Sequence, residues 1–398
     1  MRLVIHQTKD PHLVPSISLN RGICTADKRK RELTVFWQVF NAVESKKATL
    51  RSVEKRGSGN QAWITTFEGE GGSDHGGLFR ESVREICAEL QSINGSLKLF
   101  VPCPNQRMCI GENQDKWIPN IFATSALHLS MFRFVGSLMG MAIRTNSLLE
   151  LDLASLVWKR LVGELANLSD IFRMDEAFRA HYQLGRDVDE QDLSSCASER
   201  DWIAKGITWT YRSSMGRHLV LIPGGGDTDV QWQDKDKYLA EVVRHRLSEF
   251  ELQVNAVKEG LHSVVPPVVF SLFTWRELEA KVCGTSEINV EALRKITDHN
   301  LPEKERNPVA VMFWKVVEKM TNSDRADLLA FAWGRRRLPP NNSNLRLKIE
   351  LLSGRGDESL PEAHTCFFAI DLPKYSSEEV MHSKLLYAIR NCSAIDND

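Results

Sequence analysis

Apolar residues recur along this chain with two different spacings, which predicts a mixture of helices and strands. Steps of three and four positions predict helices over 33–43 and, most clearly, over 238–261. The apolar run 134–143 contains two glycines and predicts a tightly packed helix, while 63–67 and the strictly alternating 345–351 predict strands. The buried stripe of the longest predicted helix consists of Leu239, Val243, Leu247, Phe250, Val254, Val257 and Leu261.

Length and charge restrict the class of protein. A chain of 398 residues is too long for one core, so two or three domains are expected. The formal net charge is -1, which calls for neither a nucleic-acid partner nor a membrane surface. The run 134–143 is also much shorter than the roughly 20 residues that span a bilayer.

Neither the cysteines nor the glycines predict a bound metal or cofactor. The eight cysteines form no Cys-x-x-Cys pair and have no zinc-like histidine spacing. The glycine-rich segment 69–77 lacks the spacing of a phosphate-binding loop. Free thiols fit a reducing compartment, so we expect a cytoplasmic protein and leave the nucleus open.

One short segment near the end of the chain carries candidate chemistry. Leu-Pro at 360–361 is followed by His-Thr-Cys-Phe at 364–367 and by Leu-Pro-Lys-Tyr at 372–375. The thiol of Cys366 lies between polar residues and an apolar stretch, which suits a thiol at a strand end that is open to a partner. The alternative is a structural cysteine in a sheet, since most buried cysteines act as small hydrophobic residues.

This segment resembles the catalytic loop of the HECT family of ubiquitin ligases. The resemblance extends from about residue 33 to 394 and includes Phe-x-Gly-Glu-Gly and Asp-x-Gly-Gly-x-x-Arg-Glu within 67–81. Two phenylalanines after Cys366 and the ending 391–396 look most like the HERC-type branch. Trp333 stands where a smaller residue is common in the family.

The resemblance implies an α+β, bilobal fold. A large, mostly helical N-terminal lobe would cover 1–284, with a small subdomain at about 166–237 that receives the ubiquitin-conjugating enzyme. A compact α/β C-terminal lobe would cover 285–398. A hinge between the lobes is then expected at Gly284, Thr285, Ser286 and Glu287.

The resemblance also implies an activity. A conjugating enzyme charged with ubiquitin would pass it to Cys366 as a thioester, and a substrate lysine would then attack that thioester. His364 would either assist deprotonation or hydrogen-bond the loop, and Thr365 would position neighbouring groups. Asp396, with Asp398, is a candidate base for the lysine, although a solvated acidic tail is the alternative reading.

Four residues are implied in docking the conjugating enzyme: Phe178, Tyr182, Tyr238 and Val242. Phe178 and Tyr182 are four apart on one predicted helix, so they share a face. Burial in the core is the competing interpretation for all four residues.

Two rival functions remain at this point. A catalytically silent HECT fold would only bind the conjugating enzyme, and the intact His-Thr-Cys triplet argues against it. A papain-like thiol hydrolase would need its cysteine early in the chain with histidine and asparagine downstream, which is the wrong order here.

Overall fold

The computed structural model describes residues 14–20, 31–45, 50–51, 53–56, 59–70, 74–186, 202, 206–285, 288–333, 336–338, 346–364 and 367–391. The chain divides into two compact units: Met1–Ser147 with Leu151–Leu278, and Leu148–Glu150 with Glu279–Asp398. This division falls within helix α12 (Trp275–Cys283), a few residues before the expected lobe boundary at 284–285. The exact lobe boundary stays a prediction.

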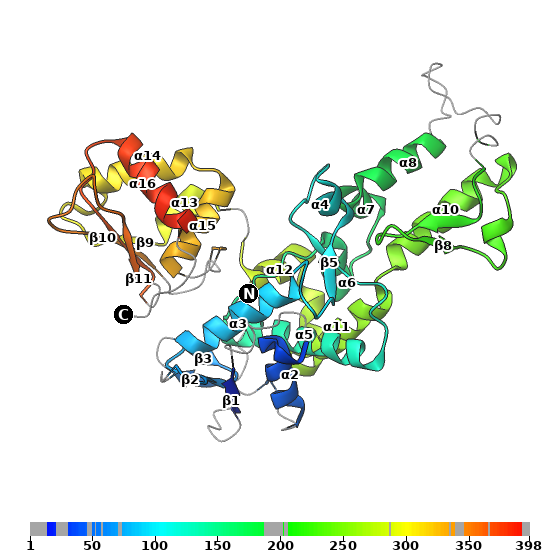
Figure 1. Cartoon of the computed structure of the whole chain (residues 1–398), viewed down its shortest axis with the longest axis horizontal. Helices are drawn as coiled ribbons and strands as arrows, with labels where there is room; N and C mark the ends of the chain where they lie inside the picture. The colour runs from blue at the N-terminus through cyan, green and yellow to red at the C-terminus, as the bar shows by residue number, and fades with distance from the viewer. Residues whose placement is uncertain are drawn as a thin grey trace, which may run out of the picture. The chain divides into compact units, whose positions relative to one another are not determined.

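In its described residues the first unit is mostly helical, with four short strand pairs (Figure 1). Its helices are α2 (Val35–Ser45), α3 (Gly77–Leu90), α4 (Pro104–Met108), α5 (Ala126–Thr145), α6 (Ser155–Val162), α7 (Leu168–Met174), α8 (Glu176–Arg186), α10 (Lys235–Ser248) and α11 (Glu251–Val264), with 3-10 turns η2 (Arg31–Leu33), η3 (Gly225–Asp227), η4 (Trp232–Asp234) and η5 (Pro267–Leu272). Its strand pairs are β1 (Ser16–Leu19) with β4 (Ile64–Phe67), β2 (Glu54–Arg56) with β3 (Gly59–Gln61), β5 (Phe100–Pro102) with β6 (Trp117–Pro119) and β7 (Thr210–Arg212) with β8 (His218–Val220).

Helices α5 and α11 pack backbone against backbone at the centre of this unit, and they run side by side in Figure 1. A Cβ added to Gly136 would overlap the carbonyl oxygen of Val257, and one added to Gly260 would overlap the carbonyl oxygen of Arg133. Each helix therefore needs a glycine where the other helix's backbone passes. The tight packing predicted for 134–143 is confirmed.

Helix α5 is longer than the sequence predicted. It has 20 residues, and its most apolar 18-residue window has a mean hydropathy of 1.4, so by length and composition alone it could cross a membrane. The run 134–143 is the apolar middle of this helix, which is longer than the run because it continues through polar residues on both sides. However, 61% of its most apolar window is buried inside the unit, as in the core helix of a globular domain.

The single helix predicted over 238–261 is two helices in the structure. Helix α10 ends at Ser248 and α11 begins at Glu251, with Phe250 fully buried between them. Both oxygens of the Glu249 carboxylate accept the Ser214 backbone N–H at 3.2 Å. The apolar spacing continues through this break, so periodicity could not show it.

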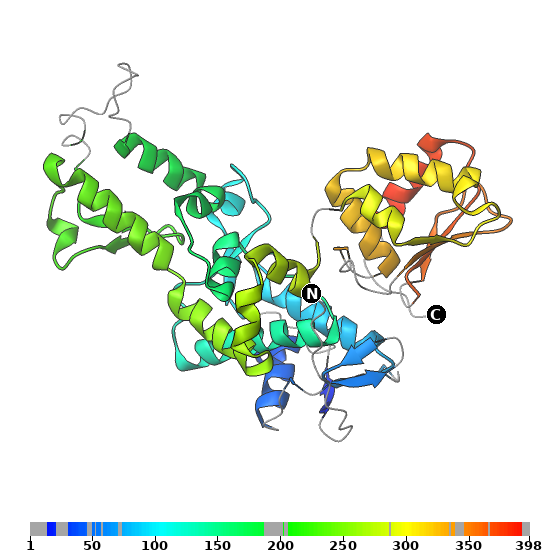
Figure 2. The ribbon, with the colours of Figure 1, turned by 180° about the vertical axis from the view of Figure 1, so that it is seen from behind.

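The second unit is a compact α/β structure (Figure 2). Its sheet has the strand order β11-β12-β10-β9, in which β10 is parallel to β9 and β12 while β11 is antiparallel to β12. The strands are β9 (Thr297–His299), β10 (Leu347–Leu351), β11 (Glu362–His364) and β12 (Ala369–Leu372); the helices are α13 (Val290–Lys295), the 3-10 turn η6 (Lys304–Arg306), α14 (Pro308–Lys319), α15 (Asn322–Trp333) and α16 (Glu378–Asn391). The α+β prediction is confirmed.

One face of this sheet is buried and the other is polar. Ile349 on β10 and Ile370 on β12 are fully buried in a core with α14, α15 and α16. Within the same core the Trp314 Nε1–H donates to His299 Nε2 at 2.9 Å. Because Nε2 accepts this hydrogen bond, the imidazole must be neutral. Burial, together with the nearby Arg294, lowers the pKa of His299 below its usual 6.5.

We expect Gly136→Ala or Gly260→Ala to lower the free energy of unfolding by about 1–3 kcal/mol, because backbone atoms cannot move aside as a flexible side chain could. Gly77→Ala is the matched control: it also lies in a helix, and no atom lies within 4 Å of the added Cβ. The Gly77 change should stay within about 1 kcal/mol of the parent in denaturant unfolding. Equal losses in the three variants would contradict the proposed role of the close helix contact.

We expect His299 to make the second unit less stable in acid. The unfolded chain binds the imidazole proton more readily than the folded chain, so stability falls as the pH drops below about 6.5. In His299→Gln the amide oxygen can still accept the Trp314 N–H but cannot be protonated. The melting temperature of this variant should fall less between pH 7.5 and 5.5 than that of the parent. An unchanged pH dependence would show that His299 does not contribute.

Candidate functional site

The predicted catalytic segment forms the connection between β11 and β12. His364 ends β11, and the Phe367 backbone N–H donates to the His364 carbonyl oxygen at 2.9 Å. Thr365 and Cys366, which lie between them in sequence, are outside the described residues, and their roles stay predictions. The described flanks of the thiol are therefore joined by a hydrogen bond.

The exit from this connection is held by an aromatic stack. Phe368 has the left-handed backbone φ of 53°, which is uncommon for a bulky residue. Its ring is buried and stacks on Trp333 with centroids 5.0 Å apart, while the neighbouring Phe367 is 69% exposed. The unusual Trp333 and the second phenylalanine after Cys366 thus pack against each other.

The Leu-Pro-Lys-Tyr motif supports the segment from the other side. Leu372 is fully buried in the sheet, and the Tyr375 hydroxyl donates to the Ser359 carbonyl oxygen at 3.0 Å. Burial raises the pKa of Tyr375, so the phenol remains a donor. Ser376 donates its N–H and its hydroxyl to Asp357, and these bonds lower the pKa of that carboxyl group. The hydrogen bond between Tyr375 and Ser359 therefore joins the two ends of the segment 359–375.

His364 lies beside a carboxylate. Its Nε2 is 3.4 Å from Oδ2 of Asp371 on the neighbouring strand β12. The imidazole is 50% exposed and the Asp371 side chain is 19% exposed. Sequence reasoning missed Asp371, because only the strand register brings it close to His364. The Asp371 carboxylate can therefore orient the His364 ring, and the ring is still exposed enough to contact another molecule.

Two further groups of predicted residues are described only in part. Gly284 is buried with a φ of +76°, and the exposed Thr285 forms an antiparallel bridge with Leu338, so backbone hydrogen bonds hold both residues. Ser286 and Glu287 lie outside the described residues, as do Asp396 and Asp398. The hinge and the acidic tail remain predictions.

The predicted docking residues meet at a cavity in the first unit. The cavity has a volume of about 750 Å³ and lies among α8, α10 and the β7–β8 hairpin. Phe178, Tyr238 and Val242 line it, and each is less than 10% exposed. Tyr182 does not line the cavity, but its ring lies 6.1 Å from that of Phe178. The structure therefore brings three of the four residues to one concave site, although they are also largely buried.

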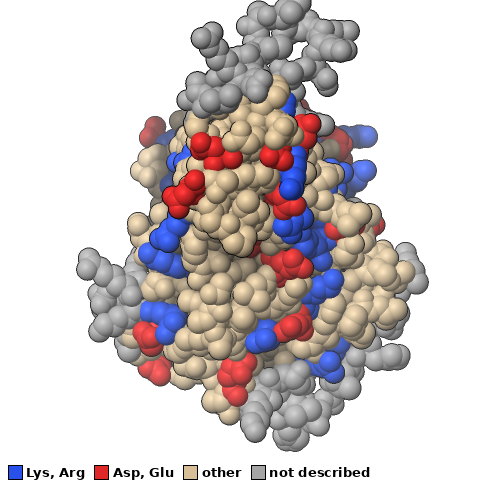
Figure 3. Space-filling view, turned by 90° about the vertical axis from the view of Figure 1, so that its right-hand side faces the viewer, with Lys and Arg blue, Asp and Glu red and all other residues tan. Residues whose placement is uncertain are grey.

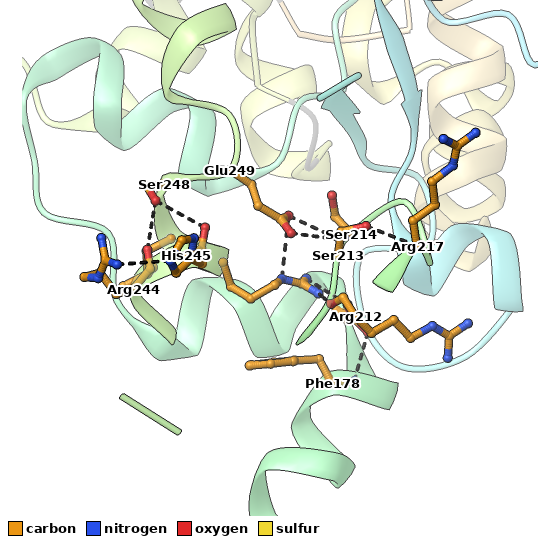
Figure 4. Close-up of polar contacts among 12 residues, drawn as sticks. Phe178, Arg212, Ser213, Ser214, Arg217, Arg244, His245, Ser248 and Glu249 are labelled. Carbon is orange, nitrogen blue, oxygen red and sulfur yellow. Dashed lines mark hydrogen bonds and ion pairs between the residues drawn. The ribbon is translucent and has the colours of Figure 1, made fainter. Parts of the chain in front are cut away.

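A buried charged cluster forms one wall of this cavity. Arg246, 1% exposed, donates to Asp175 at 2.8 Å and to the Arg212 carbonyl oxygen at 3.0 Å. Its guanidinium carbon lies 4.8 Å from the centre of the Phe178 ring. Glu249 lies 3.6 Å from Arg246 on the other side and bonds the backbone of Ser214 (Figure 4). Buried arginines of this kind must be paired, so the cluster fixes the position of α10 against the hairpin.

The sequence contained one signal for this cluster. Tyr238, Val242 and Arg246 are each four residues apart, so they lie on one face of α10. The carboxylate partners of Arg246 could not be identified from spacing alone, since Asp175 lies 71 residues earlier in the chain.

Desolvation dominates the electrostatics of the cavity. Burial raises the pKa of Glu249 despite the opposing Arg246, and it lowers the pKa of Arg107, which donates to the Ser214 carbonyl oxygen. Burial also raises the pKa of Tyr238 to about 12, and this hydroxyl donates to the Thr210 carbonyl oxygen at 2.8 Å. Tyr238 is thus a neutral donor that ties α10 to β7.

Charged residues of both signs share the face of the protein that Figure 3 draws. On the face in Figure 3, Lys and Arg side chains are interspersed with Asp and Glu side chains and do not gather into a large patch of one sign. Among the described residues, no group of three or more His, Cys, Asp or Glu side chains is arranged to hold a metal ion.

Comparison with known proteins finds relatives that match most of this chain. A family model described as HECT-domain (ubiquitin-transferase) matches residues 84–397. The E3 ubiquitin-protein ligase HERC2 of Mus musculus is 37% identical over 344 residues, which are 85% of this chain and 7% of that protein. The E3 ubiquitin-protein ligase pub3 of Schizosaccharomyces pombe is 30% identical over 344 residues, which are 83% of this chain and 41% of that protein.

The chain thus spans less than half the length of these relatives. The likeness to the HERC-type branch expected from the sequence agrees with the HERC2 match. With a family model that covers most of the residues and a fold of the predicted class, this chain belongs to the HECT-domain (ubiquitin-transferase) family.

Proposed function

We propose that this chain accepts ubiquitin from a charged conjugating enzyme as a thioester on Cys366 and passes it to a substrate lysine. Thioester exchange needs neither a nucleotide nor a metal, because the bond broken and the bond formed are of the same type. A cysteine thiol is partly ionised near neutral pH and is strongly nucleophilic. The activity is proposed from family membership together with the residues around Cys366.

One observation favours a catalytic chain over a catalytically silent docking module. The described flanks of Cys366 include the half-exposed imidazole of His364 at the end of β11. It lies 3.4 Å from the Asp371 carboxylate on β12, a strand that the buried Leu372 anchors in the core. A module that only docks a conjugating enzyme would use the cavity beside α10 and would not require this pair. The silent module nevertheless remains the second candidate, since that cavity alone would serve it.

A single-turnover assay separates the two candidates. A panel of conjugating enzymes is charged with ubiquitin and mixed with the intact chain, and the products are separated with and without reductant. A ligase forms a ubiquitin adduct that reductant removes, whereas a docking module binds the conjugating enzyme and forms no adduct.

We expect Cys366→Ala to abolish the reductant-sensitive adduct, because the alanine side chain cannot form a thioester. Cys366→Ser should slow the transfer and can retain ubiquitin as a reductant-resistant ester. Cys109→Ala is the matched control, since Cys109 is the exposed cysteine among those the structure describes as free thiols. An adduct that persists in Cys366→Ala, or one that is lost in Cys109→Ala, would place the nucleophile elsewhere.

We expect Tyr182→Ala and Phe178→Ala to weaken binding of the conjugating enzyme by about 1–3 kcal/mol, as is typical of truncated aromatic anchors. The two variants should differ in stability, because Phe178 packs on the buried Arg246 whereas Tyr182 is only partly buried. Binding is measured by titration with the uncharged conjugating enzyme, and stability by thermal melting.

Tyr238→Phe provides a control for this comparison, since it keeps the ring and removes only the bond to Thr210. Its binding should remain close to that of the parent. If Tyr182→Ala binds normally and only the buried positions matter, core packing explains these residues and the docking assignment fails.

A further inference from the structure

The carboxylate beside His364 belongs to a defined position in the sheet. Glu362 on β11 lies opposite Asp371 on β12, and His364 lies opposite Ala369. Side chains two residues apart on a strand point to the same face, so the His364 and Asp371 side chains are diagonal neighbours on the polar face of the sheet. Their 3.4 Å contact follows from this register rather than from a flexible loop.

The contact determines which nitrogen of the imidazole carries the proton. An ionised carboxylate only accepts hydrogen bonds, so the nitrogen that faces Asp371 must be the donor. That nitrogen is Nε2. In the neutral ring Nδ1 is then unprotonated and can act as a base.

We propose that Asp371 is a positioning residue that holds His364 in the Nε2–H tautomer, so that Nδ1 takes the proton of the attacking lysine. This inference rests on the proposed function and assigns a role to a residue outside the His-Thr-Cys triplet. It gives His364 the role of base for the lysine, for which the sequence had suggested Asp396 or Asp398, because orientation by Asp371 is what makes the imidazole a usable base.

The surroundings of Asp371 support this assignment. Its Oδ1 is buried and has no hydrogen-bond partner among the described residues. A carboxylate with little access to water interacts more strongly with a neighbouring imidazolium than an exposed one does. Glu362 and Glu350 flank Asp371 on the adjacent strands, so the nearest paired positions offer it no competing cation. Lys348 lies opposite Ala369, one diagonal step away.

The proposed step balances as follows. The lysine nitrogen attacks the thioester carbonyl carbon, the isopeptide C–N bond forms and the C–S bond to Cys366 breaks. The proton lost by the lysine nitrogen goes to His364 Nδ1, and the Cys366 thiolate finally takes it up. Asp371 neither gives nor takes a proton in this step and stabilises the transient imidazolium, so no oxidant, metal or further reactant is required.

The decisive experiment is a double-mutant cycle on the full chain. The adduct on Cys366 is formed first, and its discharge to free lysine is then timed for the parent, Asp371→Asn, His364→Gln and the double variant. We expect each single variant to slow the discharge at least about 10-fold and to leave adduct formation unchanged. The double variant should be no slower than His364→Gln, because Asp371 acts through His364.

Glu362→Gln is the matched control. It removes the same charge from the same face, two residues before His364, but it leaves the Asp371 contact in place. It should discharge ubiquitin at the parental rate. Additive losses in the double variant, or an equal loss in Glu362→Gln, would overturn the inference.

A second measurement does not depend on activity. The ring nitrogen chemical shifts of His364, assigned with His364→Gln, should report the Nε2–H tautomer in the intact chain and a mixture of tautomers in Asp371→Asn. A dominant Nδ1–H tautomer in the intact chain would overturn the inference even if the enzyme is active. If the intact chain forms no adduct at all, the proposed function itself fails, which is a different result from an adduct whose discharge ignores Asp371.

Discussion

The close approach of α5 and α11 is the constraint on which the first unit depends. The backbones of two helices can touch only where no side chain lies between them. Here Gly136 leaves room for the backbone of α11, and Gly260 leaves room for the backbone of α5. Helix α11 begins directly after the buried Phe250, which follows the end of α10. The position of α10 is therefore set at its C-terminal end by the core of the unit, and α10 in turn forms one wall of the cavity.

The same end of α10 is also held by charge, because Arg246 lies two residues before the helix ends at Ser248. Burying Arg246 would be costly without Asp175, Glu249 and the ring of Phe178 around it. A buried ion pair of this kind contributes little net stability, but it tolerates few alternative arrangements, because any displacement leaves a charge unpaired. The cluster thus defines the spacing between α8, α10 and the hairpin. The shape of the cavity depends on that spacing, and the free energy of unfolding depends on it much less.

Features that local spacing determines could be predicted from the sequence, whereas features that tertiary contacts determine could not. The strand at 345–351 and the helix around 134–143 were predicted because local spacing determines them, and the described part of each agrees. The break at Glu249 was missed because its cause is a contact with Ser214, 35 residues earlier in the chain. Asp371 was missed for a similar reason, since it comes near His364 only through strand pairing. Trp333 looked like an isolated departure from the family pattern, and the structure explains it through its stack on Phe368.

In the second unit the residues that hold the segment 359–375 in place are buried, whereas the described side chains nearest to Cys366 in sequence are exposed. The residues that hold the segment are buried: Leu372 and Ile370 in the sheet, Phe368 on Trp333, and Tyr375 on Ser359. The side chains beside the thiol in sequence are accessible, with Phe367 at 69% and His364 at 50% exposure. The proposed transfer of ubiquitin from one large protein to another needs open space around Cys366, and the exposure of these two side chains is compatible with it. Orientation must then come from within the sheet, and a carboxylate on the neighbouring strand is the nearest element able to supply it.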